Sequence, residues 1–175
     1  WLLERHLGII LDERQSAIWE QAREALIANA LEQPQVCVHR DFHSRNLMVT
    51  EPPSPGILDF QDAVLGPVTY DLVSLLKDCY IAWEPEQVTA WALGYRDLAV
   101  QSGVMNEVER ERFLRWFDLM GVQRHLKAAG IFARLNHRDG KSAYLRDIPR
   151  ALSYIVELGP HYPELEFLTG LITAH

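Results

Sequence analysis

The sequence predicts a mainly α-helical protein with a small β element, an α+β fold that forms one domain or one lobe of a larger protein. Two observations predict this class. Apolar residues recur at three- and four-residue steps over most of the chain, which is typical of amphipathic helices. Three short apolar runs between residues 36 and 60 are too brief for helices and are separated by polar and proline-rich stretches. With 48% apolar residues in 175, the chain can bury a core.

The first third of the chain is predicted to be one helix followed by three strands. Residues 12–31 form the helix, which Asp12 caps and Glu32-Gln33-Pro34 ends. Strands this short do not form a core by themselves, so we expect them to pack against helices. They are expected at 36–38, 47–50 and 57–60, with a turn at 52–56.

The rest of the chain is predicted to be helical. Gly66-Pro67 is expected to open a helix that runs to about residue 81. The periodicity is weaker over 131–146. Further helices are expected over about 84–103, 106–130 and 149–159.

Charge and cysteine content limit the possible functions. The net charge of -7 argues against a nucleic-acid partner, and no stretch is apolar enough to predict a membrane span. Cys37 and Cys79 lie in apolar settings. We therefore expect two buried thiols and a reducing, cytoplasmic compartment.

The residues that could carry chemistry lie in two neighbouring segments. Asp41 and Asn46 are five positions apart in the loop between the first two strands, and Asp59 ends the third strand. An antiparallel hairpin would bring the three together. Phosphoryl transfer to a hydroxyl needs a carboxylate that accepts the proton and oxygen ligands for magnesium. His39-Arg40-Asp41, then Asn46, then Asp59 is the order of the protein-kinase template. A polar hairpin with turn-capping Asp and Asn is the alternative.

These segments resemble the aminoglycoside phosphotransferase and choline-kinase family, which shares the protein-kinase-like fold. The resemblance rests on His39–Asn46, on Leu58-Asp59-Phe60 and on Gly66-Pro67 through Asp71-Leu72. Within the family, these segments and the stretch from Gly121 to Leu135 look most like one branch. That branch phosphorylates the anomeric hydroxyl of N-acetylmuramate and N-acetylglucosamine in bacterial cell-wall recycling.

The resemblance implies a set of roles and two cofactors, ATP and Mg²⁺. Asp41 would be the catalytic base, and Asn46 and Asp59 would hold the magnesium. Asp71 would brace the catalytic loop, and Asp62 would either support it or lie in a surface turn. His39 is expected to shape the loop through hydrogen bonds to the backbone.

The resemblance also implies that residues 1–175 are only the C-terminal catalytic and substrate lobe. The family's nucleotide-binding N-terminal lobe carries a Gly-rich loop and a Lys, and no Lys precedes Lys77 here. The chain begins at Trp1, on a segment that reads as the middle of a helix. We therefore expect a piece of a longer protein, with little kinase activity of its own.

Four residues are candidates for substrate contact, and each has a plainer interpretation. Arg45 could touch phosphate or pair with an acidic neighbour, and Trp83 could stack on a sugar or join the core. Arg124 and Lys127 could hold the carboxylate of muramate or form a solvated helix face.

Several alternatives stay open. The acceptor could be an aminoglycoside, choline or another small alcohol. The fold could also serve as a non-catalytic binding module. His39 and His43 have the spacing of zinc ligands but lack an obvious third ligand. We expect a nucleotide and a small sugar as partners, without nucleic acid or membrane, and the oligomeric state is open.

Overall fold

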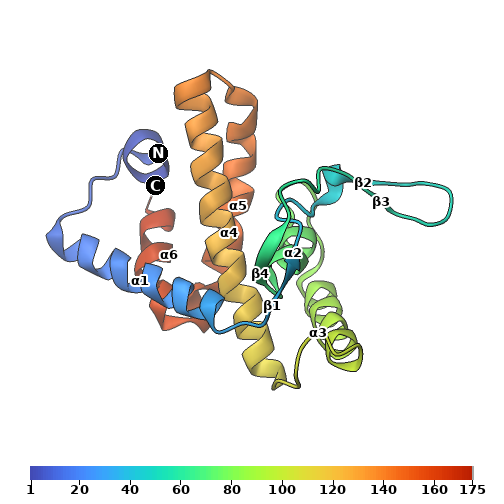
Figure 1. Cartoon of the computed structure of the whole chain (residues 1–175). Coiled ribbons are helices and arrows are strands. Elements are labelled where there is room, and N and C mark those ends of the chain that lie inside the picture. Colours follow the sequence, from blue (N-terminus) through green and yellow to red (C-terminus); the bar gives the residue numbers. More distant parts are fainter. Residues whose placement is uncertain (175) are drawn as a thin grey trace. The chain divides into compact units, whose positions relative to one another are not determined.

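A computed structural model describes residues 1–174, and Figure 1 shows its helices and strands. The chain divides into two units, which are described separately. Residues 29–121 form one, and residues 1–28 with those from 122 onward form the other. The predicted class, mainly α with a small β element, is confirmed.

Two antiparallel strand pairs, one nested within the other in sequence, organise the unit of residues 29–121. β1 (Gln35–Val38) pairs with β4 (Val64–Pro67), so that Val38 faces Val64. Between them, β2 (Leu47–Met48) pairs with β3 (Gly56–Ile57), and the turn that joins them extends as a narrow arm (Figure 1). The outer pair therefore closes the whole segment 39–63, which contains most of the polar motif.

β4 is the main correction to the predicted strands. Gly66-Pro67 was expected to open a helix, but both residues belong to the strand opposite β1. A Cβ at Gly66 would lie 2.6 Å from a methyl group of Val38, so this crossing requires glycine. The partner strand lies some 30 residues upstream, and local sequence patterns carry no information about such pairing. The predicted strands 47–50 and 57–60 are also longer than the observed β2 and β3.

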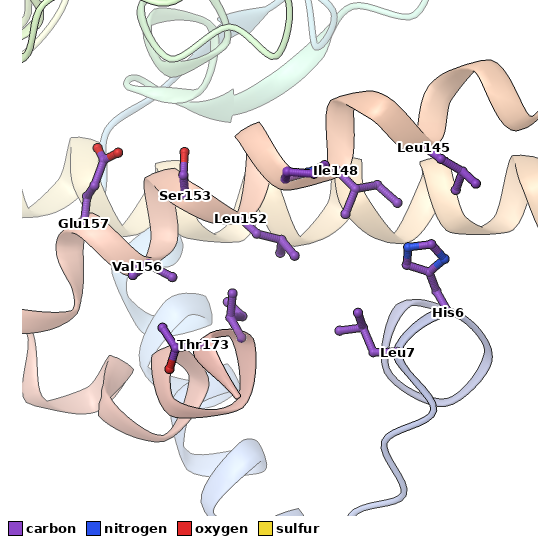
Figure 2. Close-up of a pocket in the computed structure, with 11 residues that line it drawn as sticks. His6, Leu7, Leu145, Ile148, Leu152, Ser153, Val156, Glu157 and Thr173 are labelled. Carbon is purple, nitrogen blue, oxygen red and sulfur yellow. The ribbon is translucent and has the colours of Figure 1, made fainter. Parts of the chain in front are cut away.

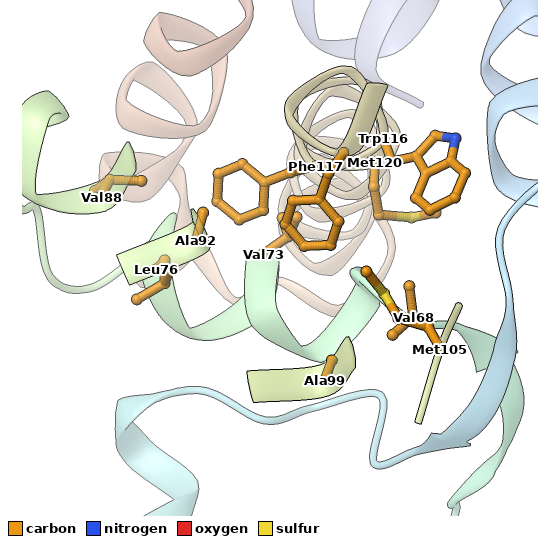
Figure 3. Close-up of a cluster of buried hydrophobic side chains, with 11 residues drawn as sticks. Val68, Val73, Leu76, Val88, Ala92, Ala99, Met105, Trp116, Phe117 and Met120 are labelled. Atoms are coloured by element: carbon orange, nitrogen blue, oxygen red, sulfur yellow. The ribbon is translucent and has the colours of Figure 1, made fainter. Parts of the chain in front are cut away.

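The helices of this unit pack around one apolar cluster (Figure 3). α2 (Tyr70–Leu76) is shorter than the helix predicted over 66–81, whereas α3 (Pro85–Gln101) matches its prediction. The aromatic face of α4 (Arg110–Asp139) is buried, with Trp116 and Phe117 in the core. The cluster contains Val68, Val73, Leu76, Val88, Ala92, Ala99, Met105, Phe113, Trp116, Phe117 and Met120.

In the other unit, α1 (Glu13–Leu31) begins where the sequence predicts. Asp12 Oδ1 accepts a hydrogen bond from the backbone N–H of Gln15 at 2.8 Å, and Gln15 Oε1 accepts one from the N–H of Asp12 at 3.0 Å. This reciprocal pair is a capping box, and it satisfies amide groups that the helix itself leaves unpaired. The short π-helix Leu2–Leu7 precedes it and ends at Gly8.

The C-terminal segments of this unit are more helical than predicted. α4 continues to Asp139 through Gly130, because Ala129, Phe132 and Ala133 are buried and supply packing that offsets the glycine. α5 (Ile148–Leu158) matches the predicted last helix, but α6 (Glu166–Thr173) was not predicted. Short 3₁₀ segments connect them at Ser142–Asp147, Gly159–His161 and Pro163–Leu165.

A cavity of about 580 Å³ lies among α5, α6 and the π-helix, with Leu152, Val156 and Leu7 in its lining (Figure 2).

Two further findings concern the cysteines and the prediction about membrane spans. Cys37 is exposed and Cys79 is half-buried, so the prediction of two buried thiols is wrong for Cys37 and is not fully met by Cys79. Over residues 1–174, no helix combines the length and the apolar character needed to cross a membrane.

Candidate active site

The loop from β1 to β2 ends beside the segment that follows β3. The β2–β3 ladder pairs Leu47 with Ile57, and the N–H of Leu58 donates to the carbonyl oxygen of Asn46 at 3.0 Å. Asn46 is thus hydrogen-bonded to the residue before Asp59. The hairpin therefore brings two of the three predicted chemical residues to the ends of neighbouring strands.

Asp41 and Asn46 are joined within the loop itself. The Asn46 side-chain Nδ2 donates to the backbone oxygen of Asp41 at 2.9 Å, and the N–H of His43 donates to the same oxygen at 3.0 Å. The amide nitrogen of Asn46 is therefore hydrogen-bonded within the loop, whereas its amide oxygen stays available for another partner. Within residues 1–174, neither that oxygen nor the half-buried Asp41 carboxylate has a hydrogen-bond partner.

Asp71, at the start of α2, holds the first half of the loop. Its two carboxylate oxygens accept hydrogen bonds from the N–H groups of His39 at 2.6 Å and Arg40 at 3.0 Å. Arg40 has a φ of 77°, a left-handed conformation that costs a non-glycine residue free energy. The charge-assisted bonds offset that cost. Asp71 thus makes the contacts that the predicted bracing role requires.

His39 links the loop to the end of β3. Its Nε2 lies 2.8 Å from the carbonyl oxygen of Leu58, and its ring meets Phe42 edge-on at 5.8 Å. The expected hydrogen bond from this ring to the backbone is therefore present.

For residues 1–174, no group of three or more His, Cys, Asp or Glu side chains could hold a metal ion.

Asp59 and Asp62 differ in what their carboxylates do. Asp59 has a φ of 63°, and one carboxylate oxygen accepts a hydrogen bond from the side chain of Gln61 at 2.6 Å. Asp62 is exposed, and only its backbone oxygen contacts the loop, through the Arg40 guanidinium at 3.4 Å. The surface-turn interpretation of the Asp62 side chain is the one that this geometry favours.

The four candidate substrate residues are divided between the two units. Arg45 is exposed, with its guanidinium carbon 3.5 Å from the centre of the Tyr80 ring. Trp83 is 45% exposed and packs edge-on against Trp91 at 5.3 Å. Arg124 and Lys127 lie on α4 within the other unit.

Sequence patterns did not identify two side chains that support the site. Asp78 is buried and accepts a hydrogen bond from the N–H of Ser44 at 3.0 Å. Gln33 is also buried, and its side-chain oxygen accepts from the hydroxyl of Thr69 at 2.7 Å, just before α2. A signal for Asp78 exists, because it follows Asp71 by about two helical turns, but none marks Gln33.

A largely apolar cavity of about 550 Å³ adjoins the loop. His39, Phe42 and Phe60 line it, together with Cys37, Ile57, Ala63 and Asp71.

Burial raises the pKa of the Tyr95 hydroxyl above its ordinary value, and the Asp71 carboxylate raises it further. Tyr95 therefore stays protonated and donates to the backbone oxygen of Val68 at 3.4 Å.

The oxygen donors present fit a magnesium ion. Mg²⁺ prefers oxygen ligands and usually keeps waters and substrate phosphates in its coordination shell. The structure supplies the Asn46 amide oxygen and the Asp59 carboxylate, from neighbouring strand ends. Two protein ligands of this kind suit an ion that is shared with a nucleotide.

Comparison with known proteins identifies a family and several relatives. The family model described as the phosphotransferase enzyme family matches residues 1–106. Three N-acetylmuramate/N-acetylglucosamine kinases are 48–49% identical to the chain over 98–99% of its length. They come from Pseudomonas putida, Pseudomonas aeruginosa and Neisseria meningitidis serogroup B.

The match covers 50–51% of each of these relatives, so the chain spans about half of their length. The family match covers both the β1–β2 loop and Asp71. The polar motif, the strand ends that hold it and the similarity to these relatives lead to one conclusion: the chain belongs to the phosphotransferase enzyme family.

Proposed function

We propose that the protein to which these residues belong transfers the γ-phosphoryl group of ATP to the anomeric hydroxyl of an amino sugar. The observation that carries this proposal is the loop in which the Asp41 carboxylate and the Asn46 amide oxygen are both unengaged. Catalytic loops of phosphotransferases need these two groups free, and a turn-capping role would have engaged them.

Asp41 is the catalytic base in this proposal. Its carboxylate accepts the proton of the sugar hydroxyl as the hydroxyl oxygen forms a bond to the γ-phosphorus. The bond from that phosphorus to the β–γ bridging oxygen breaks, and ADP leaves with the electron pair. Because Asp71 fixes the backbone at His39 and Arg40, the base is presented from a rigid segment.

Asn46 and Asp59 hold Mg²⁺ in this proposal. When bound, the ion neutralises charge on the ATP phosphates. Gln61 restrains one oxygen of Asp59, and the bond from Asn46 to the Asp41 backbone sets the amide plane of Asn46. The two ligands therefore have little freedom to reorient before the ion binds.

The acceptor is proposed from the relatives, whose names specify N-acetylmuramate and N-acetylglucosamine. Arg45 and Trp83 are candidates for sugar contact in the unit that contains Asp41. Arg124 and Lys127 are candidates for the carboxylate of muramate. Since ATP is the donor, we also propose a cytoplasmic location.

A panel of acceptors tests the proposal in the full-length enzyme. N-acetylmuramate and N-acetylglucosamine are expected to be phosphorylated, with loss of their reducing ends. The methyl glycoside of N-acetylglucosamine is the matched control, because its anomeric oxygen is blocked and it should not react. Faster turnover of an aminoglycoside or choline would contradict the sugar assignment. No ATP-dependent turnover with any acceptor would favour the binding module.

A further inference from the structure

The second half of the candidate catalytic loop has its own anchor, Asp78. This side chain follows α2 and is 2% exposed. One carboxylate oxygen accepts the N–H of Ser44 at 3.0 Å, and the other accepts the N–H of Tyr80 at 2.9 Å. A buried carboxylate is stable only when its oxygens are hydrogen-bonded, so both bonds are needed. Asp78 thereby ties the segment after α2 to the loop.

Ser44 belongs to the short 3₁₀ turn that ends at Asn46. The turn spans Ser44–Asn46, and the N–H of Asn46 donates back to the oxygen of His43 at 2.9 Å. A 3₁₀ turn has about three residues, so fixing its first N–H fixes the direction of its last side chain. The position of the Asn46 amide therefore depends on the bond from Ser44 to Asp78.

Ring contacts at Tyr80 support the same turn. The Arg45 guanidinium lies over the Tyr80 ring at 3.5 Å, and the His43 ring meets Tyr80 edge-on at 5.5 Å. Asp78 holds the backbone of Tyr80, so it also places the ring against which Arg45 packs. Contacts to three successive residues before Asn46 thus depend on one short segment, Asp78–Tyr80.

The segment itself is fixed from the side of α4. The ammonium group of Lys77 pairs with Asp118 at 2.8 Å and lies 4.8 Å from the centre of the Phe117 ring. A Cβ at Gly121 would come within 3.3 Å of the Lys77 side chain. With its neighbour held in this way, Asp78 is a rigid support.

We propose that Asp78 is a positioning residue for the magnesium ligand Asn46, as Asp71 is for the catalytic base. Asp71 lies in the first turn of α2 and Asp78 follows its last turn, and each carboxylate holds one half of the loop. This inference rests on the proposed function, because it assigns the consequence of the contact to metal affinity. Loss of the Asp78 contact should weaken Mg²⁺ binding while the loop segment before Asp41 stays in place.

The test measures binding of ADP to the full-length enzyme by calorimetry while Mg²⁺ is titrated. In Asp78→Asn, one acceptor oxygen becomes an NH₂ group that faces a backbone N–H. The Mg²⁺ concentration for half-maximal ADP binding is expected to rise about tenfold or more, as for other residues that orient metal ligands. The pH dependence of kcat at saturating Mg²⁺ should stay as in wild type, because Asp71 still holds the base segment.

A second pair of variants leaves Asp78 in place. Ser44→Pro deletes the N–H that donates to Asp78 and also the hydroxyl, at the first position of a turn where proline fits and after an extended residue, His43. Ser44→Ala keeps that N–H. The Mg²⁺ requirement should rise in Ser44→Pro and stay unchanged in Ser44→Ala.

Met105→Ala controls for general destabilisation, because Met105 is a buried core residue that takes no part in the loop. Its melting temperature should fall without a change in the Mg²⁺ requirement. The inference is overturned if Asp78→Asn and Ser44→Pro require no more Mg²⁺ than Met105→Ala, or if wild-type ADP binding is independent of Mg²⁺. ADP binding needs no acceptor, so failure to phosphorylate any sugar would overturn only the proposed function.

Discussion

At the scale of single residues, the candidate site is defined by which polar atoms are engaged and which are not. The backbone oxygen of Asp41 accepts two hydrogen bonds, whereas its carboxylate accepts none from residues 1–174. The Asn46 side chain is similar: its amide nitrogen donates a hydrogen bond to Asp41, whereas its amide oxygen accepts none from residues 1–174. A loop that satisfies its backbone and leaves side-chain oxygens unpaired keeps those oxygens available for a ligand.

Two residues of the polar motif have left-handed backbone conformations. Arg40 and Asp59 are the residues other than glycine with positive φ within residues 1–174, and both belong to the polar motif. Such conformations persist where surrounding bonds over-determine them. At Arg40, the bond from its N–H to Asp71 does so.

Asp41 can be tested by one substitution in the full-length enzyme. Asp41→Asn is nearly isosteric but cannot accept the hydroxyl proton, so kcat should fall by about 10²–10⁴-fold. The KM for ATP should change little, because Asp41 is not a proposed metal ligand. Steady-state kinetics with N-acetylglucosamine measure both parameters. The matched control is Asp97→Asn on α3, an exposed carboxylate beside Arg96 that should leave kcat unchanged. Survival of turnover in Asp41→Asn would refute the base assignment.

At the scale of elements, the pairing of β1 with β4 decides where the loop begins and ends. Val38 precedes His39 and faces Val64, so the two ends of segment 39–63 are closed together. The contact depends on Gly66, which faces Val36 in the ladder and also lies against the Val38 side chain. Strand pairing and loop geometry are therefore linked through one glycine.

Two glycine-to-alanine substitutions should have opposite effects on stability. Gly66→Ala places a methyl group 2.6 Å from a Val38 methyl, and the overpacking should cost about 1–3 kcal/mol of unfolding free energy. Gly94→Ala lies on the exposed side of α3 with no atom within 4 Å, and should add about 0.5–1 kcal/mol. Urea unfolding of the full-length enzyme measures both. Equal effects from the two substitutions would show that the β1–β4 contact is not tight.

At the scale of the whole molecule, the unit of residues 29–121 exposes apolar side chains around its strands. Val49 is 98% exposed, Leu65 77% and Phe60 66%. The relatives are about twice as long as this chain, so residues 1–175 correspond to about half of each of them.

Activity of the isolated residues tests the expectation that they have little kinase activity of their own. A protein of residues 1–175 should show less than about 1% of full-length turnover, because nucleotide positioning supplies a large part of phosphoryl-transfer catalysis. A coupled assay for ADP release, with N-acetylglucosamine as acceptor, makes the comparison. Circular dichroism of the same sample shows whether the helices have formed. Turnover close to that of the full-length enzyme would show that residues 1–175 suffice for catalysis.

The sequence by itself determined the fold class, most of the helices and the polar motif. These features depend on local signals: the Asp12 cap, the apolar period of α3 and α5, and the spacing of Asp41, Asn46 and Asp59. The predictions that Cys37 is buried and that Gly66 opens a helix were wrong, because each outcome depends on the pairing of strands that are distant in the sequence.

Only the tertiary structure decided that the buried side chains of Asp78 and Gln33 hold the loop and the residue before α2. Asp78 and Gln33 act on residues 34 and 36 positions away, so their partners follow from packing and not from sequence spacing. Long-range contacts of this kind are selected when helices and strands meet in one core. A buried carboxylate such as Asp78 then has to accept hydrogen bonds from backbone N–H groups, and these bonds help to fix the shape of the candidate catalytic loop.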